Sequence, residues 1–252
     1  MKVIVELKNA TKVVTNGFNE ERVILDKVNL SIYQGDFITI LGGNGAGKST
    51  LFNVIAGTLP LTSGSVHILG EDVTNWPAEK RAKYLARVFQ DPKMGTSPRM
   101  TVAENLLIAK YRGEGRGLVP RKLSQQIEEF AQLLPRVGNG LEKHLETPAG
   151  LLSGGQRQAL SLLMASLKQP ELLLLDEHTA ALDPKTSQSL MQLTDELIAT
   201  KEITALMVTH QMKDALRHGN RLIVMKNGQI IQDQTAEEKS KMKLEDYYKL
   251  FD

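Results

Sequence analysis

The sequence predicts an α/β protein with a core built on a largely parallel sheet and a helical segment inserted into that core. Short apolar runs typical of buried strands alternate with helical segments toward both ends of the chain. Residues 90–169 have a different pattern, which is mainly helical and interrupted by proline and glycine. We therefore expect one domain over residues 1–252, with residues 1–89 and 170–252 as its core and residues 90–169 as a helical subdomain.

Local patterns predict the individual elements. Strands are expected at residues 3–7, 28–32, 37–41, 66–69, 86–89, 172–175, 203–209, 222–225 and 229–231. Helices are expected at residues 48–56, 102–111, 122–134, 154–167 and 184–199, with shorter ones from residue 77 and after residue 235. Pro184 is favoured in the first turn of its helix, and Asn227-Gly228 is a strong signal for a hairpin turn.

Composition narrows the range of functions. The chain has 31 basic and 29 acidic residues, so its formal charge of +2 is too balanced to indicate nucleic-acid binding. It contains no cysteine, which excludes disulfides and thiolate chemistry and is typical of a reducing compartment. Its apolar runs are far shorter than the roughly 18–20 residues that span a bilayer, and its opening residues predict no secretion signal. If the protein works at a membrane, a partner must hold it there.

A glycine-rich turn stands between an expected strand and an expected helix. It matches the pattern G-x-x-x-x-G-K-[ST] through Gly42, Gly43, Asn44, Gly45, Ala46, Gly47, Lys48 and Ser49. Small residues let the backbone curl around phosphates, and the following helix adds its positive end. We expect Lys48 to reach the β- and γ-phosphates, Ser49 to bind Mg²⁺ and Thr50 to hydrogen-bond the α-phosphate. The strand and helix on either side favour this interpretation over a chance glycine turn.

A fully apolar run at residues 172–175 ends in two carboxylates, Asp176 and Glu177. Ligands bind at the carboxyl ends of buried parallel strands, so these side chains are placed to act on a nucleotide. Asp176 is expected to hold Mg²⁺ through its water shell, and Glu177 is the candidate general base for the attacking water. A solvated acidic pair that closes a strand is the alternative, and the phosphate loop makes it the weaker one.

The segment Leu152-Ser153-Gly154-Gly155-Gln156 opens an expected helix, with Ser153 as its N-cap. A helix N-terminus with a serine hydroxyl and glycine amides is a second anion site. One nucleotide does not need two such sites, whereas two chains packed head to tail would use both. The alternative is a simple capped helix after a glycine turn.

With this segment, the sequence resembles the ABC ATPase family over almost its whole length. The resemblance implies a P-loop NTPase (RecA-like) core, an antiparallel β-lobe and an inserted helical subdomain. It also implies ATP and Mg²⁺ as ligands, with residues 153–156 as the signature that contacts ATP held by a second copy of the chain.

The resemblance gives roles to four further residues. Gln90 is similar to the glutamine that contacts Mg²⁺ and the attacking water, and His210 to the switch histidine that contacts the γ-phosphate. Asp183 lies in a segment similar to the D-loop, which meets the other chain, although an aspartate before a proline is on its own more often just a helix cap. Phe18 stands where the family places an aromatic residue that stacks on adenine; packing within a hairpin is its alternative.

Two positions depart from the family. His178 follows the candidate base where relatives usually have proline, which adds a titratable ring beside the catalytic centre. Many relatives carry an arginine near Met164. Neither departure removes a group that hydrolysis requires.

Two functional hypotheses follow. The first is the ATP-hydrolysing subunit of a transporter, held at the cytoplasmic face of the membrane by a permease that a homodimer drives. Residues 91–98 would then form part of the groove for a permease helix. The motifs resemble bacterial amino-acid importer cassettes, including tryptophan and tyrosine types, which work with an extracytoplasmic substrate-binding protein. The second hypothesis is a soluble ABC ATPase of an assembly system, for example for iron–sulfur clusters.

Overall fold

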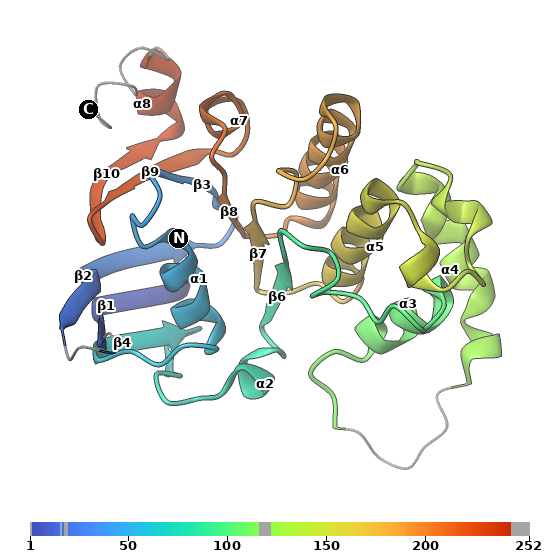
Figure 1. The fold of residues 1–252 in the computed structure, drawn as a ribbon, viewed down its shortest axis with the longest axis horizontal. Helices are drawn as coiled ribbons and strands as arrows, with labels where there is room; N and C mark the ends of the chain where they lie inside the picture. Colours follow the sequence, from blue (N-terminus) through green and yellow to red (C-terminus); the bar gives the residue numbers. More distant parts are fainter. Residues whose placement is uncertain (1, 16, 18–19, 116–121, 243–252) are drawn as a thin grey trace.

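A computed structural model of the chain describes residues 2–15, 17, 20–115 and 122–242. Its centre is a six-stranded sheet whose inner strands run parallel (Figure 1). In spatial order the strands are β10 (Gln229–Thr235), β9 (Arg221–Lys226), β3 (Phe37–Gly42), β8 (Ala205–Val208), β7 (Leu172–Asp176) and β6 (Leu85–Val88). Only β10 pairs antiparallel in this sheet, through the hairpin that Asn227-Gly228 predicts.

A second sheet is antiparallel throughout and has the order β2-β1-β4-β5. Its strands are β1 (Val3–Thr15), β2 (Glu21–Tyr33), β4 (Ser63–Ile68) and β5 (Glu71–Asp72). The first two are much longer than the predicted strands at residues 3–7 and 28–32. Their distal halves carry exposed polar residues, and register shifts break the pairing several times, so the alternating pattern is lost there.

The central sheet is covered on both faces. One set of alternate residues packs against helix α1 (Lys48–Ala56) and the antiparallel sheet, for example Ile38, Ile40 and Leu174. The other set, for example Leu173 and Leu175, packs against helices α5 (Gly154–Leu167) and α6 (Pro184–Lys201). This two-residue period explains why the strands are apolar throughout.

The remaining helices lie around this core. They are α2 (Ala78–Arg81), α3 (Val102–Lys110), α4 (Ile127–Leu133), α7 (Met212–Arg217) and α8 (Ala236–Lys241). Figure 1 shows α3, α4 and α5 gathered at one end of the molecule and the antiparallel sheet at the other. None of the described helices is long and apolar enough to cross a bilayer.

The predicted helix at residues 122–134 is wrong in its first turns. Residues Leu123–Gln125 form a short 3₁₀ turn, and α4 begins only at Ile127. Glu128 and Glu129 then stand in the first turn of α4, where acidic side chains complement the helix dipole.

One buried arginine fixes the end of α1. Arg81 is 2% exposed, and its guanidinium donates five hydrogen bonds to backbone carbonyls. Two of the acceptors lie at the end of α1: Nη1 donates to Val54 O at 2.8 Å and to Ile55 O at 2.9 Å. The guanidinium of Arg81 therefore ties the end of α1 to the segment around Val73 and Trp76.

The substitution Arg81→Met should lower the free energy of unfolding by about 3 kcal/mol or more, because five backbone carbonyls each lose a hydrogen bond from the buried guanidinium. Urea denaturation of the purified chain measures this change. Arg99→Met removes the same group from an exposed position and should change the stability by less than about 0.5 kcal/mol. Equal effects of the two substitutions would contradict the role given to Arg81.

Candidate active site

Four of the segments singled out in the sequence lie at the edge of the central sheet that is formed by the carboxyl ends of its parallel strands. Strands β3, β8, β7 and β6 are neighbours and parallel, so their carboxyl ends meet at this edge (Figure 1). Directly after them come the glycine turn, His210, the Asp176–Glu177 pair and Gln90. The fold therefore provides one site from four segments that are far apart in the sequence.

The glycine turn needs its glycines for two physical reasons. Gly45 and Gly47 have φ angles of 78° and 101°, in the region where side chains are strained. A Cβ added to Gly42 would lie 2.7 Å from the carbonyl oxygen of Met225, and one on Gly47 would lie 2.8 Å from that of Ile24. Helix α1 starts immediately afterwards without a side-chain cap, which leaves its first N–H groups to an anion.

Lys48 lies inside this turn and is 5% exposed. Its Nζ donates hydrogen bonds to Gly42 O at 2.6 Å and to Gly43 O at 3.0 Å. Burial lowers the pKa of Lys48, while the charges of Glu177 and Asp176 oppose that shift. The ammonium group therefore stands between the turn and both carboxylates, where a phosphate would meet it.

Glu177 and His210 form a direct pair. The distance between Glu177 Oε1 and His210 Nε2 is 2.5 Å, and the Glu177 side chain is only 11% exposed. Glu177 has a φ of 46°, an unusual conformation for a residue with a side chain, and its N–H donates to Val208 O at 3.0 Å. Strand β8 thus fixes the backbone of the carboxylate and also carries its histidine partner.

Sequence reasoning missed two arginines at this edge. Arg87 Nη2 lies 2.5 Å from Asp176 Oδ2, in a pair whose side chains are each 14% exposed. A charge inside an otherwise apolar strand was a signal that could have identified it. Arg22 Nη2 lies 3.6 Å from the position of a Cβ added to Gly45, so it contributes positive charge beside the turn. It lies before the predicted strand at residues 28–32, where no motif marks it.

The signature segment forms the N-terminus of α5. Ser153 caps this helix, since its Oγ accepts from Gln156 N at 3.2 Å while its own N–H donates to Gln156 Oε1 at 3.1 Å. Gln156 Nε2 also donates to Asn139 O at 3.0 Å. Ser153 and Gly154 are exposed, and a Cβ added to Gly154 would meet nothing within 4 Å. The capped end of the helix is therefore open to solvent at Ser153 and Gly154, whereas a Cβ added to Gly155 would lie 2.5 Å from Thr186 Cγ2.

The other predicted residues are placed as follows. Gln90 is exposed directly after β6, and Gln158 of α5 donates to Phe89 O at 2.9 Å just before it. Asp183 is the N-cap of α6, because its carboxylate accepts from Thr186 N at 3.1 Å. Phe18 lies outside the described residues.

His178 points away from the phosphate loop into the core beside α6. It is 2% exposed, and its Nε2 lies 3.0 Å from Thr194 Oγ1. The Thr194 hydroxyl donates its proton to Leu190 O at 2.8 Å, so Nε2–H must be the donor to Thr194. Burial and the nearby His218 lower the pKa of His178 to about 4, against an opposing effect of Asp195. The ring is therefore neutral at physiological pH and holds the backbone after Glu177 against α6.

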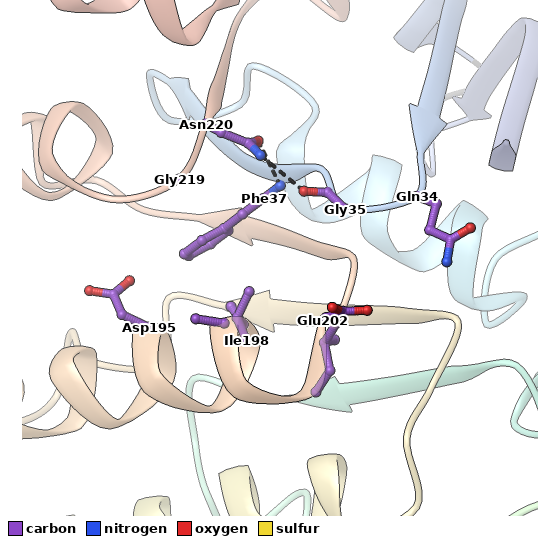
Figure 2. Close-up of a pocket in the computed structure, with 10 residues that line it drawn as sticks. Gln34, Gly35, Phe37, Asp195, Ile198, Glu202, Gly219 and Asn220 are labelled. Atoms are coloured by element: carbon purple, nitrogen blue, oxygen red, sulfur yellow. Dashed lines mark hydrogen bonds between the residues drawn. The ribbon is translucent and has the colours of Figure 1, made fainter. Parts of the chain in front are cut away.

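A separate cavity of about 570 Å³ lies at the opposite edge of the sheet (Figure 2). It opens between the start of β3 and the end of α6, and Phe37, Asp195 and Glu202 are among its lining residues. Asn220 closes one side, since its side chain accepts from Phe37 N at 2.8 Å and donates to Gly35 O at 2.9 Å. The cavity contains none of the predicted nucleotide-binding residues.

Comparisons with known proteins identify the family of the chain. Residues 25–180 match the ABC transporter family. The tyrosine transport ATP-binding protein of Clostridioides difficile (strain R20291) is 42% identical over 249 residues, which cover 99% of each chain. The chain belongs to the ABC transporter ATP-binding family. The spermidine/putrescine import protein PotA of Haemophilus ducreyi is 38% identical over 94% of this chain, which spans 59% of PotA.

Solved structures of ABC cassettes have the same fold. The dimeric cassette MJ0796 is 29% identical, with a TM-score of 0.77 over 92% of this chain and 99% of its own. A post-hydrolysis form of that dimer, bound to ADP and Pi, is 32% identical with a TM-score of 0.73 and the same coverage. The predicted P-loop NTPase (RecA-like) core with an antiparallel β-lobe and an inserted helical subdomain is therefore confirmed, and the ABC cassette is an ATPase.

The buried neutral ring of His178 should make the protein sensitive to acid. Its folded pKa lies below the unfolded value, so the stability it contributes is complete above about pH 6.5 and is lost as the pH falls toward 4. From about pH 7.5 to pH 5, wild type should lose about 2 kcal/mol more unfolding free energy than His178→Asn. Urea denaturation at both pH values measures this, and parallel losses would show that His178 does not titrate as described.

Proposed function

We propose that the chain is the ATP-hydrolysing subunit of an importer for a small solute such as an amino acid. The observation that carries the hydrolytic part is the Glu177–His210 pair, which lies at the same sheet edge as the phosphate loop and Lys48. The importer part is supported by relatives named for tyrosine transport and for spermidine/putrescine import. The first of these matches along the whole chain, and we infer tyrosine or a similar amino acid as the class of cargo.

The residues at this edge fit a magnesium ion bound together with ATP. Ser49 is exposed at the start of α1, and Asp176 ends β7, so a hydroxyl and a carboxylate are available as hard oxygen donors. No group of three or more metal-ligating side chains occurs among the described residues, which suits an ion held mainly by phosphates and water. We propose Ser49, Asp176 and Gln90 as its protein partners. When bound, Mg²⁺ neutralises charge that develops on the phosphates.

The chain's own groups would then perform the hydrolysis. Residues Gly42–Gly47 cradle the phosphates through backbone N–H groups, and Lys48 leaves the carbonyls of Gly42 and Gly43 for the β- and γ-phosphates. Glu177 accepts a proton from the water that attacks the γ-phosphate. His210 releases the carboxylate and turns to the γ-phosphate, which its 45% exposure allows. Thr50 bonds the α-phosphate, and Phe18 stacks on the adenine.

Two copies would complete each site. In this proposal Ser153, Gly154, Gly155 and Gln156 contact the ATP held by the partner chain, and the exposure of Ser153 and Gly154 at the start of α5 supports this. Asp183 combines its capping role with a contact across this interface. The dimeric solved cassettes support such an arrangement. ATP binding closes the pair, and hydrolysis reopens it.

A groove between the core and the helical side is the proposed docking site for the permease. It has a volume of about 1160 Å³ and is lined by Phe89, Gly95, Ile108 and Met164, among others. Gly95 belongs to the predicted docking segment at residues 91–98. We place the domain boundaries at residues 90 and 169, so that closure of the dimer moves the helical subdomain and the bound permease helix. The subunit would sit at the cytoplasmic face, with an extracytoplasmic binding protein delivering the solute.

No observation on the described residues favours the second candidate, a soluble assembly ATPase. The relatives named above are transport proteins, and the described groove offers a docking site for a helix of a permease. The transporter function is therefore the one we propose.

The substitution Glu177→Gln should keep ATP binding and slow hydrolysis by about 100-fold or more, because the general base is lost. The variant should form a dimer with Mg-ATP, as size-exclusion chromatography with light scattering can show. Glu171→Gln makes the same change at the other end of β7 and should hydrolyse ATP as wild type does. A Glu177→Gln chain that stays monomeric, or that hydrolyses normally, would rule out the proposed base.

Co-purification tests the transporter role directly. Tagged Glu177→Gln chain is isolated with Mg-ATP from detergent-solubilised membranes of its own cells, and its partners are identified by mass spectrometry. A multi-span membrane protein is the expected partner. Recovery of soluble partners alone would overturn the transporter role and support the assembly alternative.

A further inference from the structure

Arg87 occupies an unusual place in the central sheet. It lies in β6, the edge strand, opposite Leu174 of β7 in the parallel register. Leu85, two residues earlier, packs in the cluster that α1 also joins, so the period of two directs Arg87 to the same face. The otherwise apolar strand thus places one cation between the sheet and the first helix of the nucleotide site.

The guanidinium of Arg87 joins two elements of that site. Its Nη2 lies 2.5 Å from Asp176 Oδ2, and its Nη1 donates to Asn53 Oδ1 on α1 at 2.7 Å. Asp176 is the carboxylate proposed for Mg²⁺. A guanidinium in contact with it neutralises its charge and repels a second cation nearby.

Arg87 also lines the groove proposed for the permease. Its guanidinium carbon lies 4.8 Å from the centre of the Phe89 ring, which lines the same groove. Its Nε is buried and has no hydrogen-bond partner among the described residues. Hydrogen bonds therefore fix the two ends of the guanidinium but not the Nε–H group. A displacement of the Phe89 ring can therefore move the Arg87 guanidinium and so alter its contact with Asp176.

We propose that Arg87 links the groove to the magnesium site: paired with Asp176 it weakens Mg²⁺ binding, and an occupant of the groove that displaces Phe89 loosens this pair. The inference rests on the proposed function for the identity of the occupant. The weakening of Mg²⁺ binding by the Arg87–Asp176 pair, called the restraint below, does not depend on that identity. It can be measured on the chain alone.

Equilibrium binding of ADP to the purified chain measures the restraint without hydrolysis. The quantity is the ADP affinity in excess Mg²⁺ divided by the affinity in EDTA. Arg87→Met should raise this ratio by about fivefold, because a cation that repels Mg²⁺ is removed. Arg87→Lys keeps the charge and should change the ratio less than about twofold.

Arg112→Met is the matched control. Arg112 lines the same groove, but it donates to the carbonyl oxygens of Ala165 and Lys168 rather than to a carboxylate of the nucleotide site. Its substitution should leave the Mg²⁺ ratio unchanged. An unchanged or lower ratio in Arg87→Met, with ADP binding in EDTA retained, would overturn the restraint. If Arg87→Met does not fold, Arg87→Lys provides the test. An Mg²⁺ ratio for Arg87→Lys more than about twofold below that of wild type would also overturn the restraint.

The absence of cysteine allows the groove to be filled at one chosen point. Ile108 lines the groove and is 39% exposed, so Ile108→Cys can be labelled with a bulky maleimide. The label should raise the Mg²⁺ ratio of the otherwise wild-type chain and leave that of the Arg87→Met chain unchanged. No effect of the label, or equal effects in both chains, would refute the link. Neither result depends on finding a permease, so it is separate from the co-purification test.

Discussion

The parallel arrangement of four neighbouring strands is the constraint on which the nucleotide site depends. Strands β3, β8, β7 and β6 all end at one edge, and the chain delivers a polar group directly after each end. Parallel strands are almost always buried and apolar, so the hydrophobic core and the position of the candidate catalytic groups have the same origin. If one strand shifted by one residue, each of its side chains would point to the opposite face of the sheet.

Charge balance organises the groups gathered at this edge. Lys48 is buried and lies near both carboxylates, Asp176 contacts Arg87, and Glu177 contacts His210. Lys48 is a cation near both carboxylates and Arg87 is a second one beside Asp176, so positive charge offsets the electrostatic cost of burying them. A bound nucleotide brings several negative charges and a divalent cation, so every one of these pairs has a competing partner.

Most of this edge of the sheet could be predicted from the sequence, because its motifs are patterns of neighbouring residues. The glycine turn, the apolar strand before Asp176 and the N-cap at Ser153 are all local patterns, and the structure has each of them. Arg87 and Arg22 escaped detection, since their importance arises from neighbours distant in the chain. The role of His178 was also open, because its partner Thr194 lies on another element. Strand β2 and the start of α4 were misjudged where polar residues obscure the periodicity.

The starts of α1 and α5, which the sequence predicts to be anion sites, favour a protein that works as a pair. The uncapped start of α1 belongs to the phosphate loop, whereas the start of α5 is capped by its own serine and faces open space. The helices also pack on opposite faces of the central sheet, α1 with one core cluster and α5 with the other. The sheet thus stands between the two helices within one chain. In a second chain turned head to tail, α5 would approach the phosphate loop from outside, and the solved cassette MJ0796, which has this fold, is a dimer.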